Sequence, residues 1–209
     1  LEIINIFTDD GKINHNAPTN YQGLDRFEAR KRILNDLGDL FVKEENIKNK
    51  VPYGDRSNSI IEPYLTDQWF ADAKKLSVKA KKIVKNKKTN FFPTNWSKTY
   101  FQWMNNIEPW CISRQLWWGH QIPAWYTPDN KIIVASDEDE AIKIAKKKYK
   151  KNVELKRDPD VLDTWFSSGL WAFATLGWPQ KNDYLKKFYP TSVLVTGFDI
   201  IFFWVARMI

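Results

Sequence analysis

Residues 192–208 read SVLVTGFDIIFFWVARM, and this stretch decides which fold the sequence favours. Its first part, Ser192 to Thr196, is a short apolar run rich in β-branched side chains, which predicts a strand. Gly197 ends the run, and a helix is expected to begin near Asp199. A strand that meets glycine and leads into a helix is typical of nucleotide-binding parallel sheets, whose ligands lie outside the carboxyl ends of the strands. We therefore expect an α/β fold with a parallel sheet.

Gly197 and Asp199 are the candidate nucleotide contacts of this segment. Glycine lets a nucleotide approach the backbone, and the first turn of a helix directs N–H groups at anionic groups. The carboxylate of Asp199 could accept hydrogen bonds from ribose hydroxyls, as an acid does in dinucleotide-binding folds. Asp199 could equally be an ordinary helix N-cap. The residues of this segment alone leave both roles open.

The composition indicates a folded chain with a substantial core. Of the 209 residues, 43% are hydrophobic and 15% are aromatic, which excludes a disordered protein and allows one large or two small domains. The 11 tryptophans are unusually many. Tryptophan concentrates both in cores and at binding surfaces, so each of them has a structural as well as a functional interpretation.

The net charge of +7 suits a nucleic-acid partner without requiring one. Eight lysines lie between Lys74 and Lys88, and apolar residues alternate with them at roughly helical spacing. This pattern predicts a helix with a solvated lysine face, and a surface that contacts phosphates is the alternative interpretation.

The sequence offers no metal cluster, disulfide or membrane span. Cys111 is the single cysteine, which fits a reducing compartment and a cytoplasmic protein. The two histidines, His15 and His120, show no metal-ligand spacing. No run of about 18 apolar residues occurs, so we expect no transmembrane helix.

The pattern of predicted elements divides the chain near residue 65. Before it, Ile3 to Phe7 and the turn residues 8–11 predict the start of a hairpin, and residues 24–37 predict a helix that ends at Gly38. After it, the predicted elements are a lysine-rich helix ending by Asn90, a helix at Trp96 to Ile107, strands at Gln121 to Tyr126 and Lys131 to Ala135, and a helix to about Tyr149 that begins with a capping box of Ser136 and Asp139.

Three long segments resemble the class I aminoacyl-tRNA synthetases for branched aliphatic amino acids. They occur in the family's order and read RQLWWGHQIP at residues 114–123, DVLDTWFSSG at residues 160–169 and GFDIIFFW at residues 197–204. Their forms look like the valine-specific group rather than the isoleucine or leucine groups. Shorter matches extend the resemblance over nearly the whole chain: NIFTDDG at residues 5–11, GLDRFEAR at residues 23–30 and IEP at residues 61–63.

The resemblance implies that the two regions belong to different domains. Residues 1–65 would be the trailing part of an inserted, β-rich editing domain, and residues 66–209 the second half of a Rossmann-type catalytic domain with its connecting helices. Trp165, Ile200 and Trp204 would line the pocket for the valine side chain, because two indoles and a branched aliphatic group make a dry slot. Gly197 and Asp199 would hold the adenosine ribose of ATP and of the adenylate.

The reaction that the resemblance implies joins valine to its tRNA at the expense of ATP. The valine carboxylate attacks the α-phosphate of ATP, which enters with Mg²⁺, and the adenylate then acylates the terminal ribose of tRNA(Val). This chemistry depends on positioning and charge stabilisation, so no catalytic side chain is identified in this chain. An apolar slot for valine rejects isosteric threonine by only about 10², a known property of these enzymes, which explains the attached editing domain.

Several features of the family are expected to lie outside this sequence. The His-x-Gly-His signature should precede Leu1 and the mobile lysine-rich loop should follow Ile209, so we expect the chain to be inactive alone. The editing-site cluster also belongs upstream, and Asp9, Asp10 and Asp25 are interpreted as turn and helix-start residues. Residues 53–58, where some relatives carry cysteine or histidine, contain neither, so zinc is not supported there. Two alternatives stay open: an isoleucine-type synthetase, and a non-catalytic tRNA-binding module built from synthetase parts.

Overall fold

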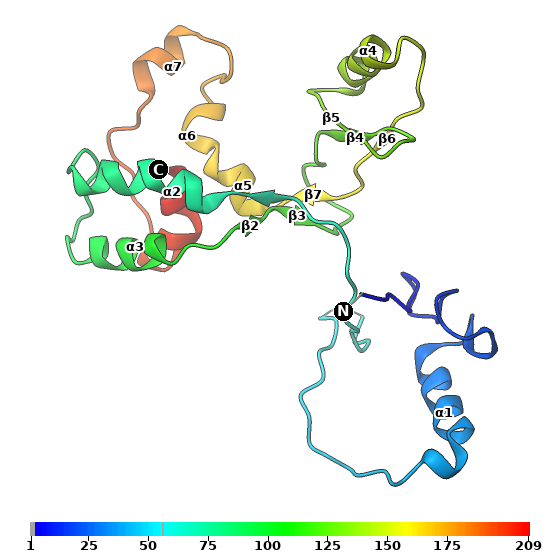
Figure 1. The fold of residues 1–209 in the computed structure, drawn as a ribbon. Helices are drawn as coiled ribbons and strands as arrows, with labels where there is room; N and C mark the ends of the chain where they lie inside the picture. Colours follow the sequence, from blue (N-terminus) through cyan, green and yellow to red (C-terminus); the bar gives the residue numbers. More distant parts are fainter. Residues whose placement is uncertain (1–2, 56) are drawn as a thin grey trace. The chain divides into compact units, whose positions relative to one another are not determined.

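The computed structural model describes residues 3–55 and 57–209 and divides into two compact units. The units are Leu1–Asp67 and Gln68–Ile209 (Figure 1). Each is described by itself below. The proposed functional residues all belong to the second unit.

Helix α1 (Arg26–Asp36) is the main regular element of the first unit. It begins where the sequence predicts an acidic start, because the Asp25 carboxylate accepts a hydrogen bond from the Phe27 N–H at 2.9 Å. Gly38 adopts φ +49°, so the helix ends at the glycine that allows a left-handed backbone. Two short 3₁₀ helices flank α1, η1 (Thr19–Tyr21) and η2 (Gly38–Leu40).

The turn predicted at residues 8–11 is present. The Thr8 N–H donates to the Lys12 carbonyl at 2.8 Å, and Gly11 adopts φ +75°. Phe7 and Ile13 form an antiparallel bridge across the turn. The bridge is isolated, and the described part of this unit contains isolated bridges in place of the β-rich ladders that the sequence led us to expect.

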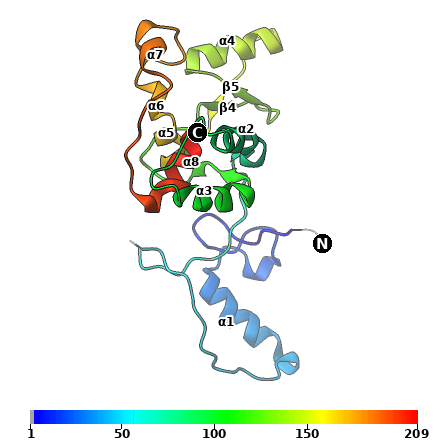
Figure 2. The same ribbon diagram turned by 90° about the vertical axis from the view of Figure 1, so that its left-hand side faces the viewer.

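Helices α2 (Ala73–Lys85) and α3 (Trp96–Asn105) confirm two of the predicted helices and lie side by side (Figures 1 and 2). The Asp72 carboxylate caps α2 by accepting a hydrogen bond from the Lys75 N–H at 3.0 Å. Apolar residues spaced along both helices meet in a buried cluster with the C-terminal segment: Ala80, Val84, Tyr100, Met104, Ile201 and Ala206.

A second core lies between helix α4 (Glu138–Tyr149) and a three-stranded sheet (Figure 1). Strand β4 (Ala124–Tyr126) pairs antiparallel with both β5 (Ile132–Val134) and β6 (Lys156–Arg157). Trp125 is 1% exposed and fills the centre of this core. The cap of α4 differs by one residue from the prediction, since Asp137 accepts from the Glu140 N–H while the Ser136 N–H donates to the Glu140 carboxylate.

Two short antiparallel ladders connect the remaining parts of the second unit. Strand β1 (Phe70–Ala71) pairs with β2 (Trp110–Cys111), and β3 (Ser113–Arg114) pairs with β7 (Val161–Leu162). After β7 the chain forms α5 (Thr164–Gly169), α6 (Trp171–Ala174) and α7 (Asp183–Phe188).

The predicted strand at residues 192–196 is wrong, and no parallel pairing occurs among the described strands. A parallel strand is stable only when it is paired and covered on both faces. Residues 193–197 have no strand partner in the described chain and form no regular element, and Val193 and Val195 are 76% and 89% exposed.

The predicted helix after Gly197 is present but distorted. A 3₁₀ turn, η3 (Phe198–Ile200), leads into a π-helix, η4 (Ile201–Val205), and then into α8 (Ala206–Met208). Stacking of Phe198 on Trp96, with ring centroids 5.1 Å apart, holds the start of this segment against α3. None of the helices in the described part of the chain is long and apolar enough to cross a membrane.

Candidate functional site

A cavity of about 520 Å³ lies in the second unit beside Trp165. Aromatic and aliphatic side chains from α3, β2, α5 and η4 form most of its wall. Four charged side chains also line it: Glu108, Arg114, Asp163 and Arg207. An apolar space with a few convergent charged groups is the usual form of a small-molecule site.

Trp165 is held in this wall from both ends. Its backbone N–H donates to the Asp163 carboxylate at 2.8 Å, so Asp163 is the N-cap of α5. Its indole stacks on Phe203 of η4, with ring centroids 5.8 Å apart and planes inclined by 15°. The cap fixes where α5 begins, and the stack fixes the indole relative to η4.

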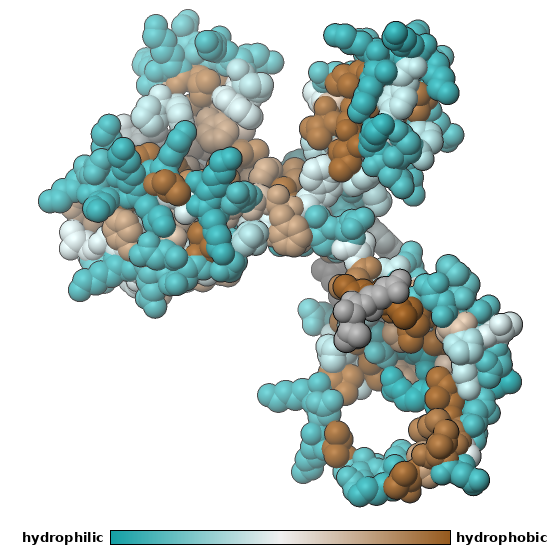
Figure 3. Space-filling model, viewed as in Figure 1, coloured by the Kyte–Doolittle hydropathy of each residue, from teal (hydrophilic) through white to brown (hydrophobic). Residues whose placement is uncertain are grey.

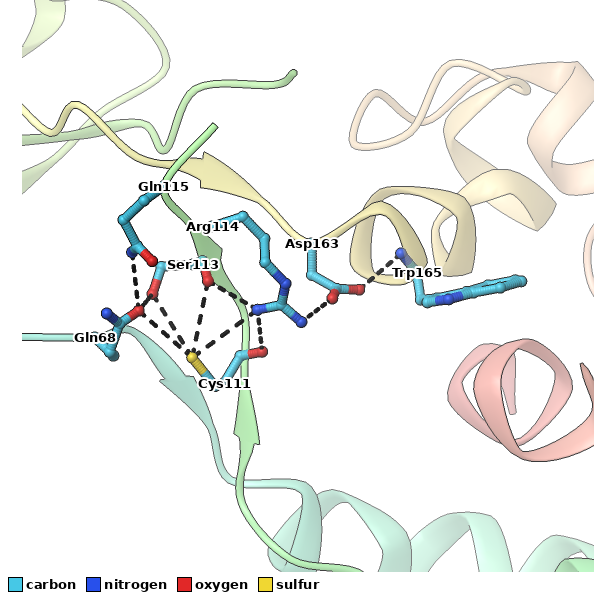
Figure 4. Close-up of polar contacts among 7 residues, drawn as sticks. All are labelled: Gln68, Cys111, Ser113, Arg114, Gln115, Asp163 and Trp165. Carbon is cyan, nitrogen blue, oxygen red and sulfur yellow. Dashed lines mark hydrogen bonds and ion pairs between the residues drawn. The ribbon is translucent and has the colours of Figure 1, made fainter. Parts of the chain in front are cut away.

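Arg114 and Asp163 point toward one another and form an ion pair behind Trp165 (Figure 4). The pair joins β3 to the start of α5, and the side chain of Asp163 is only 8% exposed. Arg114 also donates to the carbonyls of Cys111 and Ser113, at 3.0 and 2.8 Å. The guanidinium therefore has its direction fixed by three acceptors, which favours a single orientation of the Asp163 carboxylate.

The strand that carries Arg114 is anchored by Ser113 and Gln68. The buried Ser113 hydroxyl donates to the Gln68 side-chain carbonyl at 2.7 Å and accepts from the Trp69 N–H at 2.9 Å. Gln115 donates to the same Gln68 oxygen at 3.1 Å (Figure 4). Residues far apart in sequence thus fix β3, and with it the Arg114 guanidinium.

Arg207 places a second cation at the cavity. Its guanidinium lies 3.7 Å from the centroid of the Trp110 ring, a cation–π arrangement. Burial lowers the pKa of Arg207 below its ordinary value, and the nearby negative charge of Asp163 acts in the opposite direction. Arginine nevertheless stays protonated at neutral pH, so two charged guanidiniums line the cavity together with the acidic side chains of Glu108 and Asp163.

Of the three residues expected to form the valine pocket, only Trp165 lines the cavity, and both Trp204 and Ile200 lie outside its lining. The Trp204 indole N–H donates to the Ser168 carbonyl of α5 at 3.0 Å. Ile200 is partly buried at the end of η3. The backbone passes from i→i+3 to i→i+5 hydrogen bonding between Ile200 and Trp204, so these residues do not share the face that residues four apart share on an α-helix.

Gly197 and Asp199 are exposed and lie outside the cavity lining. The Asp199 carboxylate folds back over Gly197, where an added Cβ would come within 2.4 Å of its oxygen. An added Cβ would displace only the end of this exposed side chain, and a φ of −68° is open to any residue, so the fold itself does not require glycine at this position. No side chain caps η3, so the N-cap interpretation of Asp199 is not supported.

Asp158 is a buried polar centre near the site that sequence reasoning did not identify. Its carboxylate accepts hydrogen bonds from the Trp69 indole at 2.8 Å and the Tyr126 hydroxyl at 2.7 Å. Burial, followed by the hydrogen bond to Asp158, raises the pKa of Tyr126 to about 12. The neutral phenol is therefore the form that the fold stabilises.

Titration of Tyr126 should therefore occur far above its ordinary range. Because the pKa of Tyr126 is higher in the folded than in the unfolded protein, the unfolded tyrosine ionises first as the pH rises. The contribution of Tyr126 to the free energy of unfolding is therefore fully present below pH 10 and is lost as the pH rises toward 12. The difference between ultraviolet tyrosinate titrations of the wild type and Tyr126→Phe isolates this hydroxyl. We expect a midpoint at a pH of about 12, and a midpoint at the ordinary tyrosine value would contradict the buried donor role.

The sequence interpretation identified Trp165 alone among the lining residues and missed all four charged ones: Glu108, Arg114, Asp163 and Arg207. Arg114 and Asp163 both lie inside the recognised motifs, and the Asp-Thr-Trp order is itself an N-cap signal. Their pairing depends on the antiparallel β3–β7 register, which no local pattern reveals. Among the described residues, no group of three or more histidine, cysteine or acidic side chains could hold a metal ion.

Comparison with known proteins gives one consistent result. The family described as tRNA synthetases class I (I, L, M and V) matches residues 12–209. The chain is 79% identical to a valine–tRNA ligase of Pelagibacter ubique, over all of this chain and 24% of that protein. It is 56% identical to the valine–tRNA ligase of Caulobacter vibrioides and 59% identical to that of Legionella pneumophila, in each case over all of this chain and 23% of the relative. The chain thus spans about a quarter of the length of these relatives.

Proposed function

The chain belongs to the class I tRNA synthetases, and on this premise we propose that it forms part of a valine–tRNA ligase. The observation that carries the proposal is the 79% identity to a protein of that name over the whole chain. The whole enzyme would activate valine with ATP and transfer it to tRNA(Val). Magnesium enters this scheme only with ATP, as part of the substrate, and we expect the enzyme in the cytoplasm.

The residues that we propose for the valine side chain are Trp165, Trp204 and Ile200, of which Trp165 lines the cavity. The positions of Trp165 and Trp204 support this role. Trp165 lies in the first turn of α5, and the Trp204 indole donates a hydrogen bond to the Ser168 carbonyl of α5, so both indoles are held by one short helix. Phe203 stacks on Trp165 and reduces the freedom of its ring. A rigid apolar wall of this kind selects a branched aliphatic side chain by shape.

The proposed adenylate contacts are Gly197 and Asp199. Both are exposed and have no competing side-chain cap, so an incoming ribose could reach them. The Asp199 carboxylate folds back over Gly197, so a hydrogen-bond acceptor lies beside a backbone segment that has no side chain. This arrangement suits the two hydroxyls of a ribose, which donate to a carboxylate.

The proposed reaction has two steps. In the first, a valine carboxylate oxygen forms a bond to the α-phosphorus of ATP, and the bond to pyrophosphate breaks. In the second, a hydroxyl of the terminal tRNA ribose attacks the acyl carbon of the adenylate, and AMP leaves. The role of this chain is to bind and orient the valine and adenosine parts, a contribution that lowers the barrier by fixing the reacting geometry.

We also propose that the first unit is the trailing part of an editing domain. Editing is needed because an apolar pocket discriminates poorly between valine and threonine, which have nearly the same shape. In this proposal Asp25 remains a helix cap, as its hydrogen bond to Phe27 indicates.

Amino-acid-dependent exchange between ATP and pyrophosphate tests the proposed function. The full-length enzyme that contains this chain should exchange with valine far faster than with isoleucine, because an extra methylene in a filled apolar pocket costs about 1–3 kcal/mol. The reverse preference would assign the enzyme to isoleucine. An absence of exchange with either amino acid, together with retained tRNA binding, would indicate a non-catalytic tRNA-binding module.

A further inference from the structure

The segment 73–107 has an unusual charge pattern. It contains nine lysines and no aspartate, glutamate or arginine. Eight of the nine lie between Lys74 and Lys88, in α2 and the turn that follows it. Because like charges in one helix repel one another at i,i+3 and i,i+4 spacing, such a segment costs stability unless an anion is nearby.

The fold collects three of these lysines around a hollow. The buried face of α2 packs through Ala73, Ser77, Ala80 and Val84, which leaves the lysines on the outside. Lys81, Lys82 and Lys85 line a hollow of about 530 Å³, which Val78, Phe101 and Asn105 complete. The surface over α2 is correspondingly hydrophilic (Figure 3). Cations from α2 thus surround a floor that includes one aromatic ring and one amide.

The three lysines have no acidic partner within the part of the chain that the structure describes. The ion pair found for α2 there joins Lys74 to Glu108 at 2.8 Å, away from the hollow. Helix α4 shows the contrast, because Glu138, Asp139 and Glu140 in its first turn balance the lysines of its last turn. Among the described residues, the positive charges of Lys81, Lys82 and Lys85 are therefore uncompensated.

We propose that Lys81, Lys82 and Lys85 bind the sugar–phosphate backbone of RNA. The inference rests on the proposed function, in which that RNA is the tRNA substrate. Three cations on adjacent turns match a row of phosphates, and each lysine that pairs with a phosphate releases a condensed counterion. Phe101 adds a ring face for a sugar or base, and Asn105 adds an amide donor. A floor of two apolar side chains is too small for the buried anchor of a protein interface.

The salt dependence of tRNA binding tests this inference. In the full-length enzyme, the triple substitution of Lys81, Lys82 and Lys85 by Gln should weaken tRNA binding and reduce the slope of log K against log salt by roughly 2 units, from three lost phosphate contacts. Substituting Lys146, Lys147 and Lys148 by Gln is the matched control, because these three lysines lie near the C-terminal end of α4 as the other three lie near that of α2. The control should leave Kd and slope unchanged.

Valine-dependent exchange separates failure of this inference from failure of the proposed function. That assay needs no tRNA, so its rate should be the same in the wild type and in both triple variants. Unchanged tRNA affinity and slope in the Lys81, Lys82 and Lys85 variant would overturn the inference even if exchange with valine is normal. Polyglutamate serves as a probe for an acidic polypeptide. If the Lys81, Lys82 and Lys85 variant lost polyglutamate binding but kept tRNA binding, the hollow would be assigned to an acidic polypeptide and the inference would be overturned.

Discussion

Replacing Trp165 with alanine in the full-length enzyme is expected to lower kcat/KM for valine activation by about 30-fold or more. The figure corresponds to a loss on the order of 2 kcal/mol, which is below the roughly 3–5 kcal/mol for a fully buried aromatic side chain because Trp165 is only partly buried. The substitution removes the ring that stacks on Phe203 and widens the cavity beside it. Trp204→Ala should have an effect of similar size, and it also leaves the Ser168 carbonyl without its indole donor.

The amino-acid and ATP kinetics distinguish a pocket defect from a general loss of structure. ATP–pyrophosphate exchange should show the loss in the KM for valine, while the KM for ATP changes little. Trp171→Ala is the matched control, because Trp171 lies in the next helix and is 63% exposed. It should leave valine activation within twofold of wild type, since surface substitutions usually cost at most about 0.5 kcal/mol. Unchanged valine kinetics in Trp165→Ala would refute its place in the pocket.

Local patterns predicted the helices of this protein because helices are stabilised mainly by residues close in sequence. Asp25 and Gly38 mark the limits of α1, and the apolar spacing of residues 73–84 marks the buried face of α2. The strand expected at residues 192–196 is absent because strands, unlike helices, are stabilised mainly by residues distant in sequence. A strand depends on partners distant in sequence, and an apolar run alone cannot supply them.

The sequence identified Trp165 in the candidate site, but not the other aromatic lining residues or the polar contacts. Trp165 and Trp204 were visible in their motifs, and the structure ties both to α5. The ion pair of Arg114 with Asp163 joins residues 49 positions apart, and it exists because β3 and β7 pair in one register. The hydrogen bonds of Asp158 likewise reach Trp69 and Tyr126 across long separations. Such contacts depend on tertiary structure, so sequence periodicity carries no signal for them.

Removing the Asp163 carboxylate is expected to loosen α5 and the indole that it carries. In Asp163→Ala, the Trp165 N–H loses its cap acceptor, which costs about 1 kcal/mol, and the partly buried Arg114 loses its counter-charge, which adds about 2 kcal/mol. A total of roughly 3 kcal/mol corresponds to hydrogen exchange about 100-fold faster at the amides of α5. Hydrogen–deuterium exchange of the full-length enzyme, followed by mass spectrometry of its peptides, measures the exchange rate of the α5 amides.

Two further variants separate the cap from the ion pair. Asp163→Asn keeps an oxygen that can accept from the Trp165 N–H but removes the negative charge, so its exchange rate should fall between those of the wild type and Asp163→Ala. Asp137→Ala removes the corresponding cap of α4, where the acid has no ion pair, and should accelerate exchange there only about fivefold. The KM for valine should rise in the order wild type, Asp163→Asn, Asp163→Ala, because the position of Trp165 depends on both contacts. If Asp163→Ala accelerated exchange in α5 no more than Asp137→Ala accelerates it in α4, the ion pair with Arg114 would contribute nothing to the stability of the pocket wall.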